Sequence, residues 1–262
     1  MSSAFNLGRL FGIQFRLHFT WFIIFILVTV SLVYPDYSKW LYWVIGIVTS
    51  LLFFASVLAH ELAHSLVGRA NGIPMESITL FIFGGVAQMT REVTRPGAEL
   101  KMAAAGPICS LIIGGLFGLI WLLLPSIPEP VATMIFSLAV MNGILAAFNL
   151  IPGFPLDGGR VLRSLLWHTT ASYSRSTRIA TRVGQGTGYL FILGGISIIF
   201  LRPLGLSWFD GVWIGFIGWF LANAASVSYR QLRLQEAYHS LSSSKTPYPD
   251  QPIVPPGGSA AV

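Results

Sequence analysis

The stretch WLYWVIGIVTSLLFFASVLAHELAHSLVGR, residues 40–69, decides the fold of this protein. Its first part, residues 40–59, contains no Asp, Glu, Lys or Arg. About 20 apolar residues in a helix are enough to span the hydrocarbon core of a bilayer. Further charge-free runs of at least 19 residues occupy 17–35, 102–128, 130–156, 183–201 and 211–229. The sequence therefore predicts an all-α polytopic membrane protein with six transmembrane helices.

The composition excludes several classes of protein. Hydrophobic residues make up 54% of the chain and charged residues only 10%, with a mean hydropathy of +0.70. A soluble domain carries about 25% charged residues, so this chain cannot cover a water-facing surface. Its single cysteine, Cys109, cannot form an internal disulfide. A soluble enzyme and a secreted disulfide scaffold are both excluded.

The basic residues indicate the orientation in the membrane. With the N-terminus inside, 14 of the 16 lysines and arginines fall on segments that face the cytoplasm, and only Lys39 and Arg202 do not. Such a bias is typical of cytoplasmic loops. We therefore expect a multi-pass protein of the cytoplasmic (cell) membrane with both termini in the cytoplasm, and no nucleic-acid partner. An amphipathic segment on the cytoplasmic side is expected up to about residue 182, and its basic residues between 160 and 182 are expected to contact lipid headgroups.

Three further segments complete the organisation. Residues 72–93 are rich in β-branched and aromatic residues and are interrupted by Gly84-Gly85, which predicts a small β-hairpin or sheet near the cytoplasmic membrane face. Residues 1–229 are predicted to form the six-span core. A cytoplasmic polar helix is expected at 230–241, and a disordered tail rich in Pro, Ser and Gly at 242–262.

The motif HELAH, residues 60–64, interrupts the second apolar run. Residues four apart lie on one face of an α-helix, so His60 and His64 can both present nitrogens to one metal ion. Glu61, on the same turn, can reach a water at that metal. The alternative is a helix end with two hydrogen-bonded histidines. Ionisable side chains within a span are costly and by default indicate a functional site, which favours metal binding.

Two histidines leave a catalytic zinc site one protein ligand short, because such sites use three. The run 130–156 is predicted to pass inward, and its polar end carries Asp157 to a depth similar to that of His64. Two interpretations fit this residue. Asp157 can complete the metal site, or it can cap the helix that begins near it, as aspartate often does.

Two motifs together carry a resemblance to a known family. HELAH within a span, followed by NLIPGFPLDGGR at residues 149–160, resembles the site-2 protease family of intramembrane zinc metalloproteases. The similarity covers residues 6–235 and includes GIPMESITLFIFGGVA and AAAGP. No loop is long enough for an inserted PDZ-type domain. A Pro-rich tail follows the last span where some relatives continue into a pair of CBS domains, so this chain is either a compact six-span form or a shortened piece of a longer protein.

The resemblance also implies a site. One zinc ion per chain would be bound by His60, His64 and Asp157. Glu61 would be the catalytic base, and Asn149 would contact the substrate.

The predicted function is zinc-dependent cleavage of the transmembrane segments of single-span membrane proteins, near the cytoplasmic side. An edge strand from residues 78–89 would hold the unwound substrate by β-augmentation, or the hairpin is only a structural plug on the bundle. Two other classes remain as alternatives: a membrane metal-ion transporter, and a catalytically inactive binding scaffold of the same fold.

Overall fold

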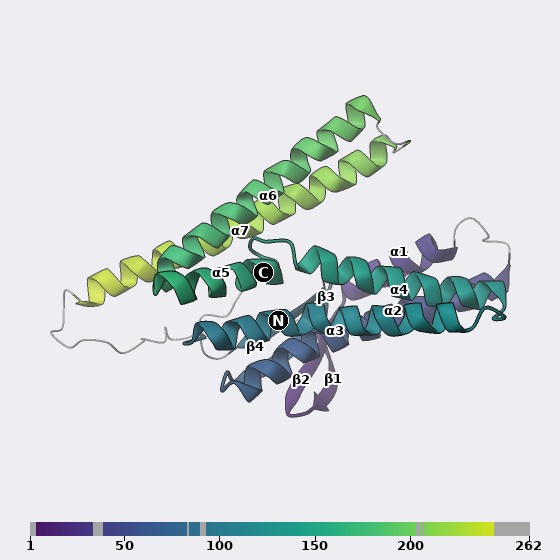
Figure 1. Cartoon of the computed structure of the whole chain (residues 1–262), viewed down its shortest axis with the longest axis horizontal. Helices are drawn as coiled ribbons and strands as arrows, with labels where there is room; N and C mark the ends of the chain where they lie inside the picture. The colour runs from purple at the N-terminus through teal and green to yellow at the C-terminus, as the bar shows by residue number, and fades with distance from the viewer. Residues whose placement is uncertain are drawn as a thin grey trace.

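A computed structural model describes residues 4–33, 39–82, 84–89, 93–202, 205 and 207–243 of the chain. The fold is mostly helical with one small sheet (Figure 1). Its elements, in chain order, are β1 (Ala4–Leu10), β2 (Ile13–His18), α1 (Trp21–Val33), α2 (Trp40–Ala70), β3 (Met75–Phe81), β4 (Gly84–Met89), α3 (Pro96–Leu123), α4 (Glu129–Asn149), α5 (Asp157–Thr170), α6 (Tyr173–Leu201) and α7 (Trp208–Ser243).

Five of these helices, α2, α3, α4, α6 and α7, are long and apolar enough to cross a bilayer. Helix α1 is apolar but shorter; its 13 residues extend about 20 Å at 1.5 Å per residue. The predicted end of the first span falls at residues 34–38, which lie outside the described part of the chain. The predicted fold class, apolar helices with a small sheet, is confirmed.

The helices expose their large apolar side chains and bury small or polar ones. On α2, Leu51 and Leu52 are exposed, whereas Thr49, Ser50 and Ser56 are buried between helices. This is the inverse of a soluble protein, and it is the arrangement expected where the surrounding solvent is lipid. Small side chains let neighbouring helices approach closely, and lipid tails solvate the leucines.

The sheet has four strands in the order β1-β2-β3-β4. The β1–β2 and β3–β4 pairs are antiparallel, and β2 pairs in parallel with β3. The predicted hairpin is confirmed as β3 and β4. Strands β1 and β2 were not predicted, and the first helix begins at Trp21 rather than Leu17. The missed signal is the alternation in IQFRLH, residues 13–18, where every second side chain is buried.

One face of the sheet packs against α2 and the start of α3. Ile13 and Phe15 of β2 and Ile78 of β3 share a buried cluster with Met102 of α3. A second cluster joins β2 and β3 to Val57, one turn before the HELAH motif. The sheet is therefore held directly beside the segment of α2 that carries the histidines.

The chain after α4 forms a short loop, the helix α5 and a long hairpin of α6 and α7. The predicted amphipathic segment up to residue 182 is divided, because Ala171 adopts a left-handed conformation and Ser172 caps α6. Helices α6 and α7 run side by side and meet the rest of the bundle mainly through α5 (Figure 1).

Helix α7 continues through residues 230–241, so the predicted polar helix extends the last span. Residues 244–262 of the predicted tail lie outside the described residues.

Two of the basic residues expected at lipid headgroups have protein partners. Arg163 pairs with Glu99 of α3, and Arg178 pairs with Glu236 of α7. The headgroup prediction is therefore wrong for Arg163, whose side chain is only 12% exposed, whereas for the 40% exposed Arg178 it stays a prediction. Each lies where a second helix supplies a carboxylate, which the amphipathic pattern of one segment cannot reveal.

Candidate metal centre

Helix α2 places the two histidines of HELAH on one face. His60 is 2% exposed and His64 is 8% exposed. Their Nε2 atoms lie 3.1 Å apart, with the rings edge to face. The four-residue spacing therefore brings the two nitrogens to one point, as the helical period requires.

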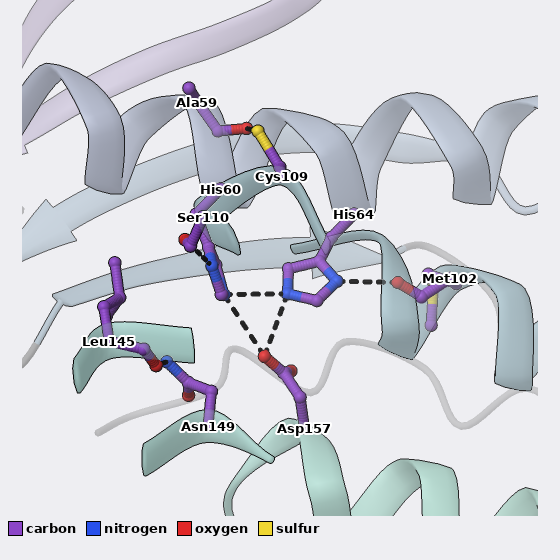
Figure 2. Close-up of polar contacts among 9 residues, drawn as sticks. All are labelled: Ala59, His60, His64, Met102, Cys109, Ser110, Leu145, Asn149 and Asp157. Atoms are coloured by element: carbon purple, nitrogen blue, oxygen red, sulfur yellow. Dashed lines mark hydrogen bonds and ion pairs between the residues drawn. The ribbon is translucent and has the colours of Figure 1, made fainter. Parts of the chain in front are cut away.

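Asp157 is the first residue of α5, and its carboxylate points at the histidine pair (Figure 2). Its Oδ2 lies 3.2 Å from His60 Nε2 and 3.1 Å from His64 Nε2. The residue at the helix cap is Leu156, and no side chain caps the helix there. Of the two interpretations open for Asp157, the geometry favours the ligand.

The Gly-Gly pair after Asp157 explains how the carboxylate reaches this position. A side chain at Gly158 would collide with the carbonyl oxygens of Leu150 and Ile151, and one at Gly159 would collide with the backbone of Gly153. Only glycine lets the start of α5 fold back against the loop that ends α4. This close approach places Asp157 opposite α2, although 93 residues separate it from His64.

The three side chains have the dimensions of a zinc site. Zinc binds nitrogen and oxygen ligands at about 2.0–2.2 Å in a tetrahedral arrangement, which puts neighbouring ligand atoms about 3.3–3.6 Å apart. The three contacts among His60 Nε2, His64 Nε2 and Asp157 Oδ2 measure 3.1, 3.1 and 3.2 Å. The group therefore suits one zinc ion, with a fourth position left for water or substrate.

Hydrogen bonds on the far side of each ring support the same conclusion. His64 Nδ1 lies 2.7 Å from the carbonyl oxygen of Met102, which can only accept, so Nδ1 carries a hydrogen and Nε2 presents its lone pair. His60 Nδ1 lies 2.9 Å from Ser110 Oγ. Such outer partners orient histidine ligands in metal sites. His60 Nε2, His64 Nε2 and Asp157 Oδ2 then face one another, an arrangement that a bound cation stabilises.

Glu61 lies beside the metal group and faces the sheet. A Cβ added at Gly85 of β4 would lie only 2.8 Å from Glu61 Cδ, so the backbone of the strand passes directly against this carboxylate. Glu61 is half-buried, on the same turn of α2 as the histidines. The structure thus brings the predicted base and the predicted edge strand together.

Asn149 is the last residue of α4 and is half-buried. Its Nδ2 donates to the carbonyl of Leu145, one turn earlier on the same helix, at 3.0 Å. Figure 2 shows Asn149 at the edge of the site, where no drawn contact joins it to the histidines or to Asp157. A contact between Asn149 and a substrate remains a prediction.

Three parts of α3 that support the site were not assigned by sequence reasoning: Ser110, the carbonyl of Met102 and Gly106. The first two bond the histidine rings. A Cβ at Gly106 would collide with His64 Nε2 and would lie 2.6 Å from His60 Nε2. The stretch AAAGP carries a signal for this close packing, because it is a run of small residues in a helix.

Two buried histidines and one carboxylate, beside a glutamate and within a bundle of apolar helices, define a membrane zinc metalloprotease. The model of Peptidase family M50 matches residues 48–128 and 125–193. The chain belongs to this family, that of the site-2 proteases.

Individual relatives agree with this assignment. The chain is 40% identical to sll0528 of Synechocystis sp., a protein provisionally named a zinc metalloprotease, over 98% of this chain and 68% of that protein. It is 37% identical to the zinc metalloprotease MJ0392 of Methanocaldococcus jannaschii, over 75% of this chain and 55% of that protein. The solved site-2 protease from Methanocaldococcus jannaschii superposes with a TM-score of 0.60 at 30% identity, covering 86% of this chain and 95% of the solved one. The chain thus spans between about half and two thirds of the length of these two curated relatives.

The close approach of α3 generates a testable prediction. Gly106→Ala should displace the imidazoles of His60 and His64 and weaken zinc binding about 10-fold or more, the usual cost of disturbing the surroundings of a ligand. Gly115→Ala, on the same helix but with open space around its Cβ position, is the matched control. Zinc affinity is measured by chelator competition on protein purified in detergent. Equal affinities for the two variants would contradict the assignment.

Proposed function

We propose that this protein is an intramembrane endopeptidase that cleaves the transmembrane segments of single-span membrane proteins near the cytoplasmic side. The observation that carries the proposal is the position of the His60, His64 and Asp157 group, buried between apolar helices and bordered by Glu61 and an edge strand. A protease of soluble substrates has no need to place its site on a helix that can cross the membrane.

The depth of the site supports cleavage close to one membrane face. His64 lies five residues, or roughly 7–8 Å of helix, before Arg69 near the end of α2. Arg69 is exposed and donates to the carbonyl of Phe11 in the β1–β2 turn. Water can therefore reach the site over a short path. The distribution of basic residues makes this the cytoplasmic face, with both termini on the same side.

The chemistry follows from the residues around the group. His60, His64 and Asp157 would hold one zinc ion, which would supply a Lewis acid for the scissile carbonyl and for a water. Glu61 accepts the proton of this water as it attacks the carbonyl, and then delivers the proton to the leaving amine. Ser110 and the Met102 carbonyl keep the two imidazoles oriented throughout.

The substrate must be unwound before it can be cut, because a helix bonds its own carbonyls. Strand β4 offers a place for the unwound segment, since it is one of the two edges of the sheet and Gly85 touches Glu61. A peptide added to β4 as a further strand would run beside the catalytic base. Asn149, at the end of α4, would donate to the peptide backbone.

Two alternatives differ from the proposal in their outcomes. A metal transporter would bind zinc and move it without cutting peptides, and it needs ionisable groups along a whole path. An inactive scaffold would bind a membrane protein without cleaving it. Membership of a peptidase family, with both histidines, Glu61 and Asp157 present, supports the protease over either one.

Replacing the base gives the central prediction. Glu61→Gln should retain zinc and lower the rate of cleavage of a single-span test substrate by about 10²- to 10⁴-fold, the usual contribution of a general base. The measurement pairs metal analysis with a cleavage assay in proteoliposomes. Asp157→Ala is the companion variant, which should bind zinc much more weakly through the two histidines alone and lose activity. A Glu61→Gln protein that cleaves at the normal rate would exclude the role given to Glu61, and zinc binding without any cleavage by the unaltered protein would favour the transporter or the scaffold.

A second prediction concerns the edge strand. With Cys109 changed to Ser and Glu61 to Gln, a cysteine introduced at Gln88 of β4 should form a disulfide with a cysteine near the cleavage site of the bound test substrate. A cysteine at Leu7 of β1, on the opposite edge of the same sheet, is the matched control. Mass spectrometry of the linked peptides gives the readout. Equal linkage from both edges, or none from β4, would support the structural plug instead.

A further inference from the structure

We propose that Arg163 and Glu99 are positioning residues that hold Asp157 at the metal. Arg163 lies on α5, the helix that begins with Asp157, and Glu99 lies in the first turn of α3. The inference rests on the proposed metal-binding role of Asp157 and does not depend on peptide cleavage.

The pair is buried and closely bonded. Arg163 donates from Nε to Glu99 Oε1 at 2.8 Å, and its Nη2 donates to the same oxygen. The Glu99 side chain is fully buried, and that of Arg163 is 12% exposed. A guanidinium that bonds through two nitrogens fixes direction as well as distance, which a lysine cannot do.

Arg163 also joins the segments on either side of α5. Its Nη1 donates to the Tyr173 hydroxyl at 2.9 Å, at the start of α6. Its Cζ lies 4.8 Å from the ring of Phe154, in the loop before α5, and 4.8 Å from the ring of Tyr173. One side chain thus links α3, the loop before α5, α5 itself and α6.

This link joins α5 to α3, the metal group joins α5 to α2, and α3 itself bonds His64 of α2 through Met102. On α5, Asp157 and Arg163 are six residues apart, or roughly 9 Å along the axis. On α3, Glu99 is three residues from Met102, whose carbonyl bonds His64. The Arg163–Glu99 contact therefore limits rotation and sliding of α5 relative to the segment that orients His64. Without it, the carboxylate of Asp157 can move away from the imidazoles.

A purely structural role is the alternative. Removing two charges from water is costly, and a buried ion pair often adds little net stability. Here one oxygen of Glu99, Oε2, is buried without a hydrogen-bond partner among the described residues. The contact with Arg163 therefore does not fully offset the cost of removing the Glu99 carboxylate from water. The more exposed pair of Arg178 and Glu236, which links α6 and α7, offers a comparison that does not touch α5.

The test measures metal affinity. Arg163→Lys keeps a positive charge beside Glu99 but loses the two-nitrogen contact and the bond to Tyr173. The affinity for zinc and for cobalt(II), by chelator competition on the full chain, should fall about 10-fold or more. The visible spectrum of the cobalt form should shift toward that of Asp157→Ala. Glu99→Gln should act in the same direction, and Arg178→Lys is the matched control, expected to leave affinity and spectrum unchanged.

A double-variant cycle separates positioning from general destabilisation. If Arg163 acts through Asp157, Arg163→Lys should change cobalt affinity little once Asp157 is already alanine. An equal fold-loss in both backgrounds would overturn the proposal. So would an unchanged affinity in Arg163→Lys and Glu99→Gln accompanied by a lower melting temperature of the metal-free protein. Failure of the proposed function would show separately, as normal metal binding without cleavage of the test substrate.

Discussion

Three electron-rich atoms, His60 Nε2, His64 Nε2 and Asp157 Oδ2, lie within 3.2 Å of one another between helices that face lipid. Ionisable groups at this depth are costly unless they are paired or bind a cation. The rest of the structure depends on keeping these atoms in contact. Helix α2 supplies two of them by its own periodicity, whereas the third must be brought from α5 by contacts between helices.

Helix α3 and the loop before α5 supply those contacts. Gly106 lets α3 pass directly against the imidazoles, and the glycines that follow Asp157 let α5 fold back against the end of α4. Met102 and Ser110 then set the direction of each ring. In the proposed positioning role, Arg163 and Glu99 complete this frame further along α5. Small residues thus create the space, and a few polar contacts orient the ligands within it.

The membrane explains why the site combines helices with a sheet. In lipid, a backbone segment that is unwound from a helix needs new hydrogen-bond partners for its N–H and C=O groups. A strand edge exposed to the hydrocarbon would leave such groups unpaired and would be unstable. The four-stranded sheet packs one face on the last part of α2 and the start of α3 and leaves β4 at an edge beside Glu61. In the proposed function, this edge gives an unwound substrate the backbone partners that lipid cannot provide.

The sequence by itself determined the features that follow from local spacing. Charge-free runs of helical length predicted the spans, the four-residue interval put His60 and His64 on one face, and the Gly84-Gly85 break predicted the β3–β4 hairpin. It left Asp157 between ligand and helix cap, missed β1 and β2, and assigned Arg163 to lipid headgroups. The deciding contacts join residues far apart in the chain, 97 positions for His60 and Asp157 and 64 for Glu99 and Arg163. Periodicity reports which face of one element is apolar, but only the packing of several elements determines which polar groups meet.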